Sequence, residues 1–339
     1  MNNRSAGPRS FNTLQRSNRL ARLKRLQEAR ILLLAICALI LVLALTGLVF
    51  LFCQIGYNVS TGGGGGISGK VKYGPLEVLP WDESADISVY RGNLILVNET
   101  HSYRYPETRI EDMTDNEKNA YSLMTYRVMV GNTFPYYVLP NSKNFYMIPE
   151  AAKAMGDLLT YHYNQTEEAL LVRAGYQQES TVSNGNYDQQ IGLSASIDND
   201  MDVSLKSDTC QKLISEGVNF GFIQRFPSGK ASETGASGCT NVFRYVGVPH
   251  AGYITSHNTT LEAYLSLLQS NYTYSKSHLL LNAAGEEVKA KDAVYEVYYV
   301  AAADGDSTQV PVPKNYHYTI SGDNMGGFIV TVNLNKSIA

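Results

Sequence analysis

Residues 220–265 read FGFIQRFPSGKASETGASGCTNVFRYVGVPHAGYITSHNTTLEAYL. Two apolar runs in this stretch, FGFIQRF and VFRYVG, predict short β-strands. A helix is predicted at TLEAYLSLLQ, where Thr259 or Thr260 is suited to cap the first turn. These elements do not follow a regular βαβ alternation. The sequence therefore favours an α+β fold over a doubly wound sheet.

The flanking sequence supports the same mixed class. Upstream, strands are predicted at NLILVN (93–98), ALLVRAGY (169–176) and GLSASID (192–198), and helices at IPEAAKAMGDLLTYHYNQ (148–165) and DTCQKLISEGV (208–218). Downstream, AVYEVYYVAA, TQVPVP and GGFIVTVNL are rich in valine and tyrosine and read as strands. Residues 279–339 are therefore expected to form a small β-rich C-terminal segment.

The N-terminal part predicts a single-pass membrane anchor. Residues 31–53 are 23 residues without a charge, and such a helix is about 34 Å long, enough to cross a hydrocarbon core of about 30 Å. Residues 1–30 carry eight Lys or Arg and one acid, which predicts a cytoplasmic tail and an extracytoplasmic location for the rest. The run of five glycines in residues 54–90 predicts a linker that lifts the folded part off the cell membrane.

The distribution of charge argues against a nucleic-acid partner. The whole chain has a formal net charge of −3, so the part after the basic tail is acidic and shows no basic stripe. A basic segment confined to the membrane flank is typical of a topogenic signal rather than of a nucleic-acid interface. The membrane is therefore the first expected partner.

Residues 220–265 resemble the VanY-type zinc D-alanyl-D-alanine carboxypeptidases. That family shows Tyr-Gly-Phe, Arg-Tyr-Pro, Lys, Thr-Gly, Glu-Pro-Trp-His-x-Arg-Tyr-Val-Gly, His-Ala and Leu-Glu-x-Tyr-Leu in this order. The matching residues here are Gly221, Phe222, Arg225, Pro227, Lys230, Thr234, Gly235, Arg244, Tyr245, Val246, Gly247, His250, Ala251, Leu261, Glu262, Tyr264 and Leu265. The resemblance implies a carboxypeptidase-type domain over residues 91–278.

The same resemblance implies a zinc ion held by His, Asp and His, and these ligands are replaced in this chain. YDQQIGLSAS (187–196) keeps the family's glycine as Gly192 but places Gln189 and Ser196 at the first two ligand positions. Val242 stands at the third. Valine cannot ligate a metal, and neutral amide and hydroxyl oxygens are poor zinc ligands beside histidine and carboxylate.

The residues that act on the substrate in that family are replaced as well. Cys239 stands where the resemblance places the glutamate that serves as general base, and Gln177 where it places an arginine that holds the substrate. Without a metal and a base nothing generates the nucleophile. The resemblance thus implies a degenerate member with no catalytic residue, no metal ligand and no cofactor.

Two arrangements could rescue chemistry. Asp198 lies two residues after Ser196 and could share its strand face, whereas Asp188 adjoins Gln189 and is expected to point the other way. Neither restores two histidines. Alternatively, Cys239 and His250 could form a cysteine hydrolase, although a histidine at 250 already belongs to the family's ordinary pattern.

These observations predict a membrane-anchored extracytoplasmic pseudoenzyme of the bacterial cell envelope, acting as a binding or scaffolding module. Its partner would be an envelope protein or a peptidoglycan stem peptide. The alternative is an active zinc-dependent D,D-carboxypeptidase that trims stem peptides. A third possibility is a domain kept for stability, with function in the C-terminal β segment.

Cys210 and Cys239 are the only cysteines after the predicted membrane span. Because an extracytoplasmic compartment favours oxidation of thiols, the sequence predicts a disulfide between them. It would close a loop of about 30 residues and add roughly 3–4 kcal/mol in the chain-entropy model.

Overall fold

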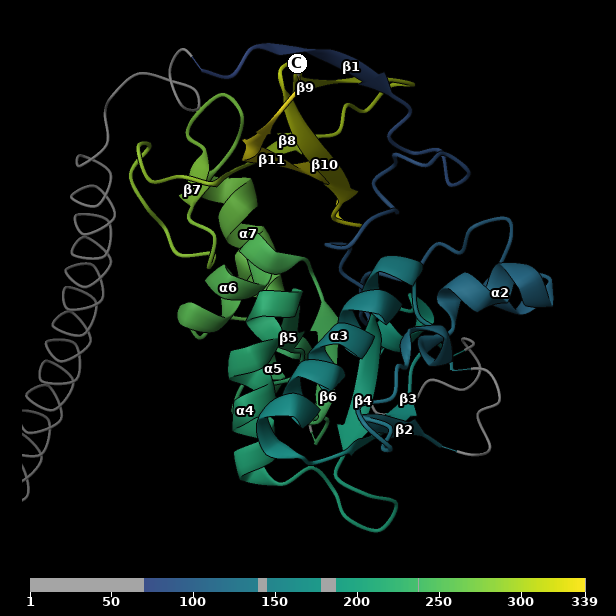
Figure 1. Cartoon of the computed structure of the whole chain (residues 1–339). Coiled ribbons are helices and arrows are strands. Elements are labelled where there is room, and N and C mark those ends of the chain that lie inside the picture. Colours follow the sequence, from purple (N-terminus) through teal and green to yellow (C-terminus); the bar gives the residue numbers. More distant parts are fainter. Residues whose placement is uncertain (1–69, 140–144, 178–186, 237, 339) are drawn as a thin grey trace, which may run out of the picture. The chain divides into compact units, whose positions relative to one another are not determined.

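The computed structural model of the chain describes residues 70–139, 145–177, 187–236 and 238–338 (Figure 1). The predicted tail (1–30) and membrane span (31–53) lie outside these residues. No helix in the described part is both long and apolar enough to cross a membrane. Residues 64–339 form one compact unit, and its mixed elements confirm the α+β class.

A five-stranded sheet stands at the centre of the residues that resemble the carboxypeptidases. Its strand order is β2-β3-β4-β6-β5, and only β2 and β3 run parallel. The strands are β2 (Tyr136–Val138), β3 (Leu170–Ala174), β4 (Ser194–Asp198), β6 (Val242–Tyr245) and β5 (Phe222–Gln224). The predicted strands at 169–176, 192–198, 220–226 and 242–247 are confirmed.

Two helices, α3 (Pro149–Thr166) and α4 (Ser207–Gly217), cover one face of this sheet. Pro149 occupies the first turn of α3, as predicted, where its missing N–H costs no hydrogen bond. The apolar side of α3, with Met155 and Leu158, meets Ala195 of β4 in the main core. The opposite face carries the alternate residues of β4 and β6, which are Ser194, Ser196, Val242 and Arg244, and the candidate site forms there.

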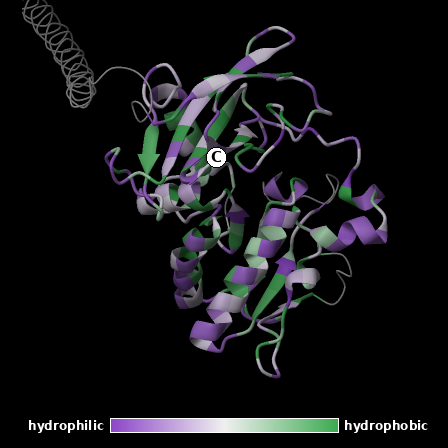
Figure 2. Ribbon diagram, turned by 45° about the horizontal axis from the view of Figure 1, so that its top comes forward, coloured by the Kyte–Doolittle hydropathy of each residue, from purple (hydrophilic) through white to green (hydrophobic). Residues whose placement is uncertain are grey.

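The remaining short elements lie around the main sheet. They are η1 (Ile110–Asp112), α2 (Asp115–Tyr121), η2 (Leu123–Tyr126), η4 (Tyr187–Gln190), η5 (Val218–Phe220) and α5 (Ala231–Thr234). A capping box between Thr114 and Glu117 starts α2. This helix buries no residue and is coloured mostly hydrophilic in Figure 2.

A second, antiparallel sheet contains most of the C-terminal segment, in the order β10-β11-β8-β7. Its strands are β7 (Leu279–Leu281), β8 (Tyr295–Ala301), β10 (Tyr316–Gly322) and β11 (Gly327–Ser337). Its inner face shares a core with α6 (Val248–Ser256) and α7 (Leu261–Asn271). The C-terminal segment is therefore packed into the fold.

The outer face of the second sheet is covered by a two-stranded ribbon. β1 (Tyr73–Val78) pairs antiparallel with β9 (Thr308–Pro313), and Val78 and Val310 pack there against Phe328. β1 lies within residues 54–90, the range expected to be linker. The described end of that range is thus part of the folded unit.

The strand predicted at residues 93–98 is wrong, although the segment is buried. Ile95 and Val97 enter the main core, whereas Leu94 and Leu96 enter the core beneath the second sheet. The segment threads between two cores, which explains its strand-like composition. Two of its backbone carbonyls accept hydrogen bonds from a side chain and not from a neighbouring strand. Arg244 Nη2 donates to the carbonyl oxygens of Asn93 and Ile95.

Candidate functional site

The positions expected to hold metal lie together on the face of the five-stranded sheet opposite α3 and α4, where Gln189 and Val242 are buried. Ser196 of β4 is the direct partner of Val242 in β6, and directly paired residues of antiparallel strands point to the same face. Gln189, in η4, donates from Nε2 to Ser196 Oγ at 3.5 Å. The three positions that the resemblance assigns to the zinc ligands therefore converge.

The two other degenerate positions adjoin this cluster through the backbone. The N–H of Gln177 donates to the carbonyl of Gln189 at 3.0 Å, and the N–H of Val242 donates to the carbonyl of Cys239 at 3.1 Å. Because these positions correspond to the catalytic cleft of the enzymes that the sequence resembles, we call Gln177, Gln189, Ser196, Cys239 and Val242 together the degenerate cleft. Sequence reasoning placed these positions in one site, and the fold brings them there.

The side chains of the degenerate cleft do not fit zinc. Gln189 and Ser196 use their polar groups on one another, and Val242 packs against Phe226 and Ala236 in a small apolar cluster. Zinc requires deprotonated or lone-pair donors such as imidazole, thiolate and carboxylate in a tetrahedral set. Among the described residues no group of three or more His, Cys, Asp or Glu is placed to hold a metal ion.

The two carboxylates that could have rescued the site are engaged elsewhere. Asp188 is fully buried and pairs with both Arg225 and Arg244. Asp198 pairs with Arg173 and accepts from Asn241 Nδ2 at 3.1 Å. A metal would have to displace these partners, so a shifted ligand register gains no support.

The retained arginines build a buried network beneath the degenerate cleft. Arg225 binds Glu262 of α7 through both terminal nitrogens, at 3.0 and 2.6 Å, and also binds Asp188. Burial lowers the pKa of Arg225, but the charges of Asp188 and Glu262 outweigh it and raise that pKa above its usual value. With Arg244 the four groups carry two charges of each sign. The network fixes η4 to β6 and α7.

The other retained residues also have structural roles. Gly192 adopts a φ of 74°, a left-handed conformation that favours glycine, and its carbonyl accepts from the N–H of Ile148 at 2.8 Å. Lys230 Nζ binds Glu233 at 2.8 Å at the start of α5. Tyr245 donates to Glu150 Oε1 at 2.7 Å. None of these contacts requires a substrate or a metal.

His250 is a buried structural histidine. Its Nδ1 lies 2.8 Å from Tyr264 Oη and its Nε2 3.0 Å from Thr331 Oγ1. Burial lowers the pKa of His250 to about 3, so the ring is neutral near pH 7. Burial also raises the pKa of the Cys239 thiol, which disfavours the thiolate nucleophile. A cysteine hydrolase built on this pair is therefore not supported.

The pKa of His250 predicts a pH dependence of stability. Between about pH 6.5 and pH 3 the unfolded chain binds a proton here that the folded chain does not. The free energy of unfolding should therefore fall with decreasing pH, by about 1.4 kcal/mol per pH unit for this group. Urea titrations at several pH values give the free energy of unfolding as a function of pH. This pH dependence should be shallower in His250→Gln than in the wild type. Equal pH dependence in the two proteins would contradict the assignment.

The predicted disulfide is absent, because Cys210 is a free thiol in the structure. Its sulfur donates to the carbonyl of Thr240 at 3.9 Å and accepts from Gln224 Nε2 at 3.5 Å. The two cysteines are neighbours through Thr240, but they pack into different clusters. Cys210 lies against the main core, and Cys239 against the small cluster around Phe226.

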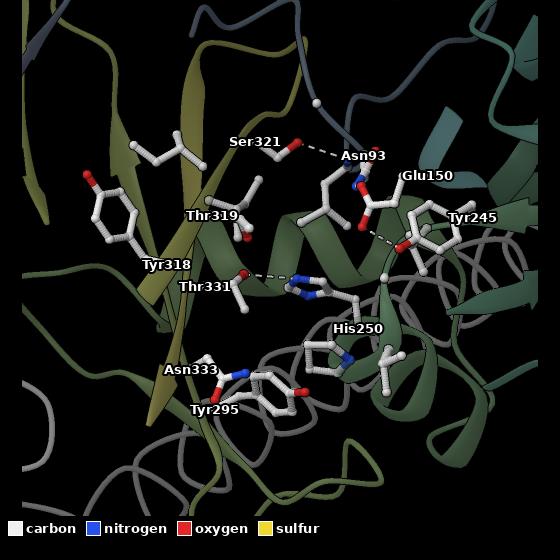
Figure 3. Close-up of a pocket in the computed structure, with 18 of the residues that line it drawn as sticks. Asn93, Glu150, Tyr245, His250, Tyr295, Tyr318, Thr319, Ser321, Thr331 and Asn333 are labelled. Carbon is white, nitrogen blue, oxygen red and sulfur yellow. Dashed lines mark hydrogen bonds between the residues drawn. The ribbon is translucent and has the colours of Figure 1, made fainter. Parts of the chain in front are cut away.

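Sequence reasoning missed a pocket of about 540 Å³ between the two sheets (Figure 3). No residue of the degenerate cleft lines it. Its walls come from the segment around Asn93, the start of α3 at Glu150, the end of β6 with α6, and the inner face of β10 and β11. One feature of the sequence pointed to this pocket. His317 and Thr319 of β10 are two residues apart and so lie on one face of the strand, and polar residues there indicate a face that is not fully packed against a core.

Comparisons with known proteins agree with the motifs. No family model matches the chain. A D-alanyl-D-alanine carboxypeptidase of Enterococcus faecium is 25% identical over 257 residues, which cover 72% of this chain and 76% of that protein. The bifunctional D-Ala-D-Ala dipeptidase and carboxypeptidase VanXYC of Enterococcus gallinarum is 32% identical over 118 residues, 31% of this chain and 57% of that protein.

A solved structure shows the same fold. The vancomycin-resistance D,D-dipeptidase VanXYg, in complex with a D-Ala-D-Ala phosphinate analogue, superposes with a TM-score of 0.55 at 24% identity. The match covers 78% of this chain and 100% of that one. The resemblance read from residues 220–265 thus extends through most of the folded unit.

Proposed function

As a homologue of the VanY/VanX-type D-Ala-D-Ala carboxypeptidases, this chain carries their fold, and we propose that it acts as a pseudoenzyme. It would be anchored by residues 31–53 in the cell membrane, with the folded unit outside. There it would serve as a binding or scaffolding module of the bacterial envelope. Digestion of the folded unit by protease added to intact spheroplasts would test this topology, and full protection would refute it.

The observation that carries the proposal is the convergence of Gln189, Ser196 and Val242 at one place. A misplaced alignment would scatter these positions, whereas the fold gathers them and fills the place with mutually satisfied or apolar side chains. The nearest carboxylate in sequence, Asp188, is held by two arginines. A chain that keeps the carboxypeptidase fold without its zinc ligands is suited to a binding role, which depends on the folded surface and not on peptide hydrolysis.

A protein partner is at least as well supported as a stem peptide at the degenerate cleft. Recognition of a terminal carboxylate favours a bidentate cation, and Gln177 supplies none. A pocket of about 370 Å³ beside η4, lined by Tyr187 and by Ser232 to Gly235 of the α5 region, gives that side of the molecule a hollow polar surface.

Assay of the purified full-length chain with a pentapeptide ending in D-Ala-D-Ala, in buffer with added zinc, tests the loss of activity. We expect no release of D-alanine above the uncatalysed rate, because the described residues include no group of ligands for a metal that would polarise the carbonyl or activate water. The E. faecium relative, assayed in parallel, supplies the positive control. Turnover by this chain that a chelator abolishes would overturn the proposal in favour of an active carboxypeptidase.

A further inference from the structure

We propose that the pocket between the two sheets binds a short zwitterionic peptide, with its ammonium group at Glu150 and its carboxylate at Lys336. This site is separate from the degenerate cleft. The proposal therefore stands or falls independently of whether the chain is a pseudoenzyme. The volume of about 540 Å³ lies within the range of small-molecule sites in proteins, about 300–1,000 Å³.

Glu150 is a preorganised anion at one end of the pocket. Its Oε1 accepts from Tyr245 Oη at 2.7 Å and its Oε2 from Asn93 Nδ2 at 3.1 Å. Both donors are neutral, and no cation among the described residues pairs with this carboxylate. Figure 3 shows the three side chains together beside Ser321. Two donors fix the carboxylate in place without neutralising it, which suits an incoming ammonium group.

The opposite end of the pocket is basic. Lys336 and His317 line it, and in the described part of the chain neither side chain has an acidic partner. His317 is paired with Asn333 across β10 and β11, and Figure 3 places Asn333 with Tyr295 away from Glu150. Glu150 and Lys336 are the only Asp, Glu, Lys or Arg among the lining residues. The pocket thus presents one charge of each sign.

The strand register sets the separation of the two ends. The N–H of Leu94 donates to Ser321 Oγ at 2.9 Å, which places the adjacent Asn93 and its partner Glu150 near Ser321. From Ser321 to His317 along β10 is four residues, or about 13 Å. An extended peptide of about four residues spans the same length. A single amino acid would reach only one end.

The walls between the ends match an uncharged peptide with small side chains. Thr319 and Asn333 offer hydroxyl and amide groups for peptide hydrogen bonds, while Leu94, Val246 and Ile329 provide apolar surface. His250 and Thr331 are hydrogen-bonded to one another at 3.0 Å, so these two polar groups of the wall are already paired. The lining therefore favours short aliphatic residues over further charges.

Isothermal titration of the purified full-length chain tests this site, with tetra-alanine as the probe. We expect saturable binding. Acetylation of its N-terminus and amidation of its C-terminus should each weaken binding by about tenfold, the effect of one charge-assisted contact. Glu150→Gln should weaken free tetra-alanine by about tenfold yet leave the acetylated peptide unaffected. Lys336→Met should likewise weaken binding of free tetra-alanine by about tenfold and leave binding of the amidated peptide unaffected.

Matched variants serve as controls for this titration. Glu150→Gln keeps the oxygen that accepts from Tyr245, so its fold should be preserved, and circular dichroism checks this. Glu107→Gln and Lys289→Met, at exposed positions outside the pocket, should leave affinity unchanged, as should Ser196→Ala in the degenerate cleft. No binding at about 10 mM tetra-alanine, or equal affinity for the doubly capped peptide, would overturn the proposal. So would a loss of affinity in Ser196→Ala that Glu150→Gln does not share.

Discussion

The triple variant Gln189→His, Ser196→Asp, Val242→His should retain about one zinc ion per chain through dialysis, since His₂Asp plus water is a complete zinc ligand set. The geometry favours this outcome. Positions 196 and 242 are paired across β4 and β6, and the end of the Gln189 side chain already lies 3.5 Å from Ser196 Oγ. Ligand atoms at that spacing can surround a metal at about 2.0–2.2 Å. Metal content is measured by mass spectrometry of the dialysed protein.

Partial restorations serve as its controls. Val242→His alone should hold no stoichiometric zinc, because one strong ligand does not retain the metal. It should also cost about 1–3 kcal/mol of stability through overpacking beside Phe226 and Ala236. Activity is not expected from the triple variant, since Cys239 and Gln177 still replace the base and the substrate-binding arginine. A well-folded triple variant that binds no zinc would mean that these positions do not face one another as inferred.

Asp188→Asn should lower the free energy of unfolding by about 3–5 kcal/mol, the cost of leaving buried charge uncompensated. Arg225 would then keep Glu262 as its acidic partner, and Arg244 would keep only backbone carbonyls among the described residues. Asp188 and both arginines are buried, so water cannot take its place. The urea midpoint should fall with little change in the m-value. The double variant Asp188→Asn, Arg244→Met should lose less than the sum of the two single variants, because the members of one network are coupled.

The matched control is Asp157→Asn. Asp157 pairs with Lys153 at 2.6 Å on the surface of α3, where both side chains are at least half exposed. Water screens that pair, so the urea midpoint should not move measurably. If Asp188→Asn were as mild as Asp157→Asn, the buried network would not be what holds η4 in place.

Local patterns predicted the elements that carry the degenerate cleft. Gln189, Ser196 and Val242 lie on or beside strands that their composition and length predict. The motif in residues 220–265 aligned Val242 with the family's third ligand position. The pairing of Ser196 with Val242 is a cross-strand contact that sequence cannot measure. It follows once β4 and β6 are neighbours in the sheet.

The errors share a physical cause, which is that the deciding partner is distant in sequence. Residues 93–98 have the apolar alternation of a strand, but Arg244 takes the carbonyls that a neighbouring strand would have bonded. Cys210 and Cys239 were the candidates for a bridge after the predicted span, yet Cys210 is a free thiol and the two residues pack against different clusters. The peptide pocket was missed because Glu150 and Lys336 are brought to one cavity only by the tertiary fold.

Direct titration of zinc into the wild-type full-length chain tests whether the carboxypeptidase scaffold has lost its metal site. We expect no stoichiometric binding and no zinc retained after dialysis, because Gln189, Ser196 and Val242 offer an amide, a hydroxyl and a hydrocarbon side chain. Retention of about one zinc per wild-type chain, lost on changing any of these three residues, would show instead that the metal site is intact.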